Sequence, residues 1–90
     1  MKIKDGFVVR RIADVAYAVA VGPRSREFSG MCKLTDTGEF LWKELSEDRS
    51  REYLAERLVS EYDVEREVAQ KDVDAFVKKL AEANLLEGEL

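Results

Sequence analysis

A compact β-rich segment over residues 7–12 and an alternation of large and small apolar residues over residues 17–21 predict two strands near the start of the chain. Residues 7–12 and residues 17–21 are rich in β-branched and aromatic side chains, which favour strands. Residues 13–15 are expected to form the hairpin connection between them. Gly22-Pro23 then predicts a turn that ends the second strand.

A third strand is expected over about residues 27–34, where the same alternation continues. Because successive side chains of a strand point to opposite faces, its residues divide into two sets. One face should carry Phe28, Gly30, Cys32 and Leu34, and the other Ser29, Met31 and Lys33.

From residue 35 onward the apolar period changes to that of a helix, and three helices are predicted. Thr35 is a good N-cap for the first, which should end near residues 46–49. Ser50 is expected to cap the second. A short break at residues 63–64 precedes a third helix over about residues 65–83.

The apolar residues of these helices recur at helical spacing and are expected to form the core. They are Phe40, Leu41 and Leu45 in the first helix, Leu54, Leu58, Val59 and Tyr62 in the second, and Val68, Ala69, Val73, Phe76, Val77 and Leu80 in the third. Trp42 should cover the edge of this core. The pattern predicts one α+β domain over residues 1–90, with three strands followed by three helices.

Composition narrows the function classes. Ninety residues, 46% of them hydrophobic, are enough for one small core. No apolar run approaches the roughly 20 residues that cross a bilayer, and residues 1–5 lack the apolar stretch of a secretory signal, so no membrane contact and a cytoplasmic location are expected. The formal net charge of −4 argues weakly against non-specific nucleic-acid binding, which depends on neutralising phosphates.

The residues needed for catalysis or metal binding are scarce. The chain has no histidine, the commonest general base and metal ligand, and only one cysteine. Cys32 alternates with Leu34 and is therefore interpreted as a small core residue rather than a nucleophile. We expect no enzymatic activity, no cofactor and no metal.

The third helix and the residue before it carry both acidic and basic side chains. Glu65, Glu67, Asp72 and Asp74 are interleaved with cations, which is typical of a solvated, ion-paired face. The cations Arg66, Lys71, Lys78 and Lys79 are either ordinary surface residues or a guide for an acidic peptide. Gly38, isolated near the start of the first helix, is interpreted as a site of close approach by a neighbouring element.

These residues together carry a family resemblance. Residues 30–45, with Leu34-Thr35-Asp36-Thr37-Gly38 between a strand and a helix that contains Leu41-Trp42, resemble the PqqD family. Further similar segments are Phe7-Val8-Val9-Arg10, Glu61-Tyr62-Asp63-Val64, Asp72-Val73-Asp74-Ala75-Phe76-Val77 and residues 80–86. Thr35, Asp36 and Asn84 depart from the usual Asn, Glu and Gly, and each keeps the physical role of the residue it replaces.

The resemblance implies a winged-helix-like domain with a three-stranded antiparallel sheet and three helices. It implies a non-catalytic module, or chaperone, that binds the leader of a ribosomally made precursor peptide, as in biosynthesis of the cofactor PQQ. The partner would be a modifying enzyme, often a radical S-adenosylmethionine protein. The leader would add as a strand to the third strand beside the third helix, in contact with Ser29, Met31, Cys32, Lys33, Lys71, Asp72, Phe76 and Lys79.

Two alternatives remain at the level of the sequence. A winged-helix nucleic-acid binder would need a basic recognition helix, and the second helix carries Arg51 and Arg57 among several glutamates. An unpaired edge strand also permits a homodimer. We expect no nucleic-acid partner.

Overall fold

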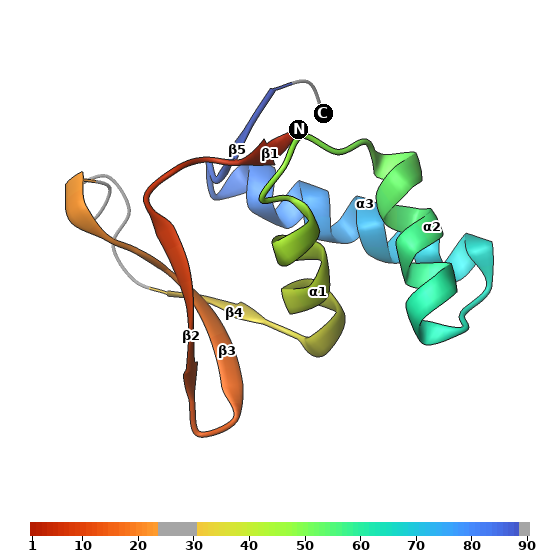
Figure 1. Ribbon diagram of the computed structural model, residues 1–90, viewed down its shortest axis with the longest axis horizontal. Coiled ribbons are helices and arrows are strands. Elements are labelled where there is room, and N and C mark those ends of the chain that lie inside the picture. The colour runs from red at the N-terminus through yellow and green to blue at the C-terminus, as the bar shows by residue number, and fades with distance from the viewer. Residues whose placement is uncertain (24–30, 89–90) are drawn as a thin grey trace.

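The computed structural model describes residues 1–23 and 31–88. The elements run β1 (Lys2–Ile3), β2 (Phe7–Ile12), β3 (Val15–Ala20), β4 (Met31–Leu34), α1 (Asp36–Glu44), α2 (Arg51–Tyr62), α3 (Arg66–Glu82) and β5 (Leu86–Glu87). The predicted α+β fold, a three-stranded antiparallel sheet followed by three helices, is confirmed. The strand order is β2-β3-β4, so β3 is the central strand (Figure 1).

The hairpin between β2 and β3 is tighter than the sequence indicated. Val15 pairs with Ile12, so it belongs to β3, and the connection consists of Ala13 and Asp14 alone. Both residues have positive φ, 52° and 65°, as a two-residue turn that matches the twist of the strands requires. The second strand ends at Ala20 rather than Val21. The predicted third strand began in residues that lie outside the described part of the chain, and its described part is β4.

Local chemistry starts the helices where the sequence predicted. The Thr35 hydroxyl accepts a hydrogen bond from the Gly38 amide at 3.0 Å, and the Ser50 hydroxyl accepts one from the Tyr53 amide at 3.1 Å. The first helix is shorter than predicted, because it ends at Glu44 with Leu45 as its C-cap. Asp63, in the left-handed conformation, ends α2.

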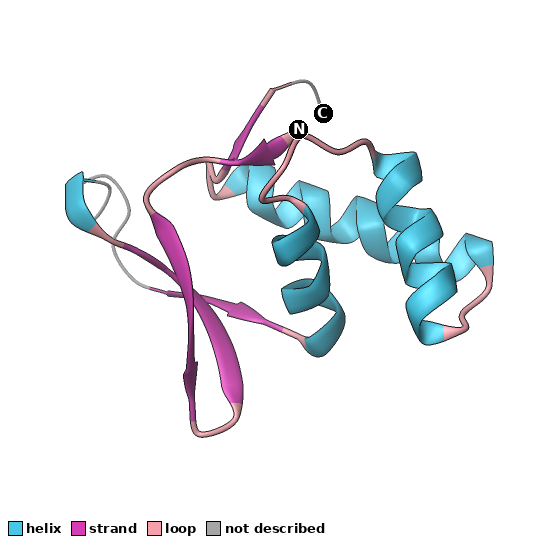
Figure 2. Ribbon diagram, viewed as in Figure 1, coloured by secondary structure: helices cyan, strands magenta, loops and turns pink. Residues whose placement is uncertain are grey.

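The three helices lie to one side of the three-stranded sheet (Figure 2). Their predicted stripes form most of the core, with Leu41, Leu45, Leu54, Leu58, Val73, Val77 and Leu80 almost fully buried. Val68 and Tyr62 are exceptions, since 45% and 41% of their surfaces are exposed. Trp42 is itself buried and meets the ring of Phe7 edge-on, with 6.4 Å between the ring centroids, which joins α1 to β2.

A small ribbon that the sequence did not predict closes the fold. Lys2 pairs with Glu87 and Ile3 with Leu86, so β1 and β5 lie side by side (Figure 1). The chain reaches β5 through Asn84, whose positive φ of 61° ends the third helix as expected. The Ile3 amide also donates to the Leu45 carbonyl at 2.9 Å. This ribbon therefore ties the start of the chain to the ends of α1 and α3.

Candidate functional site

The outer edge of β4 is open. β4 pairs with β3 on one side, and no other strand among residues 1–23 and 31–88 pairs with its second side. An open edge presents main-chain amides and carbonyls that can pair with another polypeptide. α1 follows β4 directly, and α3 reaches the same edge through Lys79.

The two faces of β4 differ as the alternation predicted. Cys32 and Leu34 are buried against the helices, whereas Met31 and Lys33 are exposed. The ammonium of Lys79 donates to the Lys33 carbonyl at 2.7 Å. That carbonyl therefore points away from β3, toward α3. Because the amide and carbonyl of a strand residue point to the same side and successive residues alternate, Met31 and Lys33 direct their main-chain groups to the open edge.

A hollow of about 200 Å³ lies beside this edge, between the start of α1 and the middle of α3. It is lined by Thr35, Thr37, Gly38, Leu41, Asp72, Ala75, Phe76 and Lys79. Little room is left for a side chain at Gly38, because a Cβ there would lie 3.4 Å from Cε1 of Phe76 and 3.1 Å from Oγ1 of Thr35. The predicted close approach at Gly38 is thus observed, and the neighbour is α3.

The predicted contact residues divide into three groups. Asp72, Phe76 and Lys79 line the hollow, and Met31, Cys32 and Lys33 form the adjacent strand. Lys71 is exposed on α3 but does not line the hollow, and Ser29 lies outside the described residues. Sequence reasoning did not assign Thr35, Thr37, Leu41 or Ala75 to the site. The only indication in the sequence that these residues belong to the site is that they lie close to Gly38 or Phe76 along the chain.

Cys32 is a free, buried thiol whose main-chain groups face β3, so it offers a neighbouring chain little direct contact. Among the described residues, no cluster of three or more histidine, cysteine or acidic side chains could hold a metal ion. None of the helices in the described ranges is long and apolar enough to cross a membrane.

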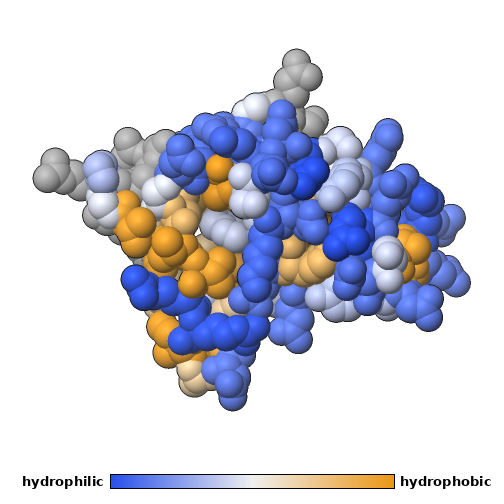
Figure 3. All heavy atoms as spheres, in the orientation of Figure 1, coloured by the Kyte–Doolittle hydropathy of each residue, from blue (hydrophilic) through white to orange (hydrophobic). Residues whose placement is uncertain are grey.

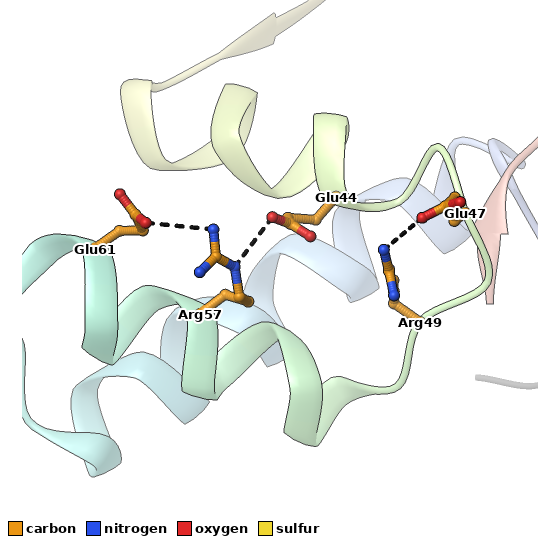
Figure 4. Close-up of polar contacts among 5 residues, drawn as sticks. All are labelled: Glu44, Glu47, Arg49, Arg57 and Glu61. Carbon is orange, nitrogen blue, oxygen red and sulfur yellow. Dashed lines mark hydrogen bonds and ion pairs between the residues drawn. The ribbon is translucent and has the colours of Figure 1, made fainter.

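The arginines of α2 are engaged within the protein. Arg51 donates to Asp74 on α3 at 2.7 Å. Arg57 donates to Glu44 on α1 at 3.1 Å and to Glu61 at 3.3 Å (Figure 4). The hydrogen bond that Arg57 donates to Glu44 is the main cause that raises the pKa of Arg57 above its ordinary value. Both cations that a nucleic-acid-binding α2 would use are therefore paired with carboxylates, which disfavours phosphate binding.

We expect Arg57→Gln to lower the urea midpoint of unfolding slightly, because Glu44 loses the cation that pairs α1 with α2. Glutamine keeps hydrogen-bonding capacity, so the loss reports on charge. The difference from the native protein should shrink in high salt, which screens this partly exposed pair. Combining the change with Glu44→Gln should add almost nothing further. Fully additive losses would mean that the two side chains are not coupled.

Comparison with known proteins completes the description of the site. The family described as "Coenzyme PQQ synthesis protein D (PqqD)" matches residues 17–86. Comparison with the curated proteins found no match. Among solved structures, the chain is similar to "TbiB1 in Complex with the TbiA(beta) Leader Peptide", with 28% sequence identity and a TM-score of 0.75. The similarity covers 100% of this chain and 99% of that one.

Proposed function

Because this chain belongs to the PqqD family, we propose that it is a peptide-binding module that captures the leader of a ribosomally made precursor peptide. The observation that carries this proposal is the full-length likeness to a protein solved with a leader peptide. The open edge of β4 beside a hollow supports it physically. The module itself performs no chemistry, and it presents the remainder of the precursor to a separate modifying enzyme.

The leader binds as a further strand of the sheet. Its amides and carbonyls pair with those of Met31 and Lys33, the described residues of β4 whose main-chain groups face the edge. Alternate leader side chains then point toward the helices and enter the hollow at Gly38 and Phe76. Such a site favours an apolar side chain, since its lining surface is mostly apolar and includes Leu41, Ala75 and Phe76.

Lys79 changes its partner on binding. In the free protein its ammonium donates a hydrogen bond to the Lys33 carbonyl, and a leader amide requires the same carbonyl as its acceptor. An arriving leader displaces the ammonium, which is then free to pair with a leader carboxylate at the rim of the hollow. Asp72, on the same rim, disfavours acidic side chains at its own end of the hollow. Lys79 and Asp72 together favour a leader whose acidic side chain lies at the Lys79 end of the hollow rather than at the Asp72 end.

The modifying enzyme is proposed, from the family, to be a radical S-adenosylmethionine protein, with both proteins in the cytoplasm. The same open edge can pair with the β4 of a second copy, so a homodimer and the leader complex compete for one surface. Binding is therefore best measured at concentrations where sedimentation shows a single species.

Titration of the isotope-labelled protein with the precursor peptide encoded beside its gene tests the proposal. We expect saturable amide shifts concentrated at residues 31–34 and on the part of α3 that lines the hollow. Duplex DNA of similar charge, added under the same conditions, should cause no such shifts. Shifts confined to α2 or to the β1–β5 ribbon, or none at all, would contradict binding at β4.

A further inference from the structure

The outward face of the sheet is organised in rows that the strand register defines. Val8, Val19 and Met31 lie directly opposite one another across the three strands and form an apolar row. The next row consists of Arg10, Tyr17 and Lys33. Directly opposite residues share one face, and all three helices lie on the other side.

Exposure supports this arrangement. Met31 is 54% exposed and Val8 is 36% exposed. Ala18 and Cys32, which belong to the inward row between these two outward rows, are buried. Apolar side chains gather over the region of the β2–β3 hairpin in the space-filling view (Figure 3). The outward face is thus an apolar surface interrupted by two cations.

The described residues provide no ion-pair partner for these two cations. Among the described residues, neither Arg10 nor Lys33 forms an ion pair. The neighbouring Arg11 provides the contrast, because it lies on the inward side and pairs with Glu39 of α1. The basic row therefore offers a positive surface on a protein whose formal net charge is −4.

We propose that this face selects the leader, by requiring an acidic residue opposite Lys33 and an apolar residue two positions away, opposite Met31. The inference rests on the proposed function, because only a strand added to β4 continues the rows. Met31 and Lys33 direct their main-chain groups to the open edge. Side chains of directly opposite residues share one face in either strand direction, so the leader residues opposite Met31 and Lys33 lie on the outward face. An added strand thus extends the apolar row by one apolar side chain and the basic row by one carboxylate.

The residue between these two positions faces inward, beside Cys32 and the helices. The recognised segment is therefore an acidic residue, an inward-facing residue and an apolar residue in succession, in an order set by the direction of the strand. Opposite charges in directly opposed positions stabilise strand pairing, and like charges weaken it.

Selection of displayed random peptides on the immobilised native protein tests this requirement without knowledge of the natural precursor. Enriched peptides should carry Asp or Glu two positions from a large apolar residue, and the tightest should shift the amides of residues 31–34. Failure to enrich any peptide that shifts those amides would contradict the proposed function itself. Enriched peptides that bind at β4 without the acidic preference would overturn the selection by the outward face and leave peptide binding intact.

A charge swap assigns the acidic preference to Lys33. With the best synthetic peptide from the selection, Lys33→Glu should weaken binding by about 3- to 30-fold. Replacing the peptide's acidic residue by lysine should restore most of the affinity for this variant. Lys78→Glu is the matched control, since Lys78 is exposed on α3 and lies outside both the rows and the hollow. Equal losses for the two variants, or no rescue by the lysine peptide, would show only a general charge effect and overturn the proposal.

Discussion

Lys33→Pro is expected to weaken leader binding by about 10- to 100-fold while the domain remains folded, because proline removes a main-chain donor from the open edge. The Lys79 contact shows that the main-chain groups of Lys33 point away from β3, so no hydrogen bond of the sheet is lost. Proline is tolerated in edge strands where its missing amide would face outward. The leader carbonyl, in contrast, is left buried without a partner, which costs about 1–3 kcal/mol.

Two variants separate the main chain from the side chain in this experiment. Lys33→Ala removes the ammonium but keeps the amide, so calorimetric titration should show a smaller loss than for the proline variant. Cys32→Pro places the same ring one residue earlier, where the amide faces β3, and circular dichroism should show a clear loss of stability. If Lys33→Pro and Lys33→Ala bind the leader equally well, main-chain pairing at β4 is not the mode of recognition.

Much of the framework could be predicted from the sequence because it depends on local rules. Two-residue alternation placed Cys32 and Leu34 inward and Met31 and Lys33 outward. The hydroxyls of Thr35 and Ser50 started their helices at the predicted residues. In each case the deciding interaction spans only a few residues.

The turn between β2 and β3 shows where local rules were insufficient. Asp14 tolerates a left-handed backbone, but Ala13 gives no sequence signal for its positive φ. From the sequence, the connection is therefore predicted to contain three residues, whereas the structure shows two. The register follows from this turn, and a shift of one residue would exchange the two faces of the sheet. The rows of the outward face could not be assigned before the turn was known.

Long-range contacts account for the remaining differences. β1 and β5 contain two residues each, too few to produce a periodic pattern, and they come from opposite ends of the chain. The contact between Lys79 and the Lys33 carbonyl joins residues 46 positions apart. The hollow lies where α3 packs against the start of α1 at Gly38. Sequence could supply Phe76 and Lys79 as candidates, but only tertiary packing places them beside the strand.

Trp42→Ala is expected to produce the largest loss of stability, about 3–5 kcal/mol in the free energy of unfolding. Trp42 is only 7% exposed, and its edge-on contact with Phe7 joins α1 to β2. A domain of this size has a total stability of about 5–15 kcal/mol, so the variant should be close to unfolding at physiological temperature. Urea denaturation followed by far-ultraviolet circular dichroism measures the change without a tryptophan signal.

Trp42→Phe should lose less stability than Trp42→Ala, because phenylalanine retains a ring against Phe7. As a control, Lys43→Ala, one residue along α1, should change the free energy of unfolding by less than about 0.5 kcal/mol. A loss below about 1 kcal/mol for Trp42→Ala would mean that the ring is not part of the core. Trp42 does not line the hollow beside β4. In the cold, where the variant is still mostly folded, its affinity for the leader should therefore approach the native value. Lys33→Pro should show the opposite behaviour, with normal folding and weak binding, because stability and recognition depend on different residues of the same small domain.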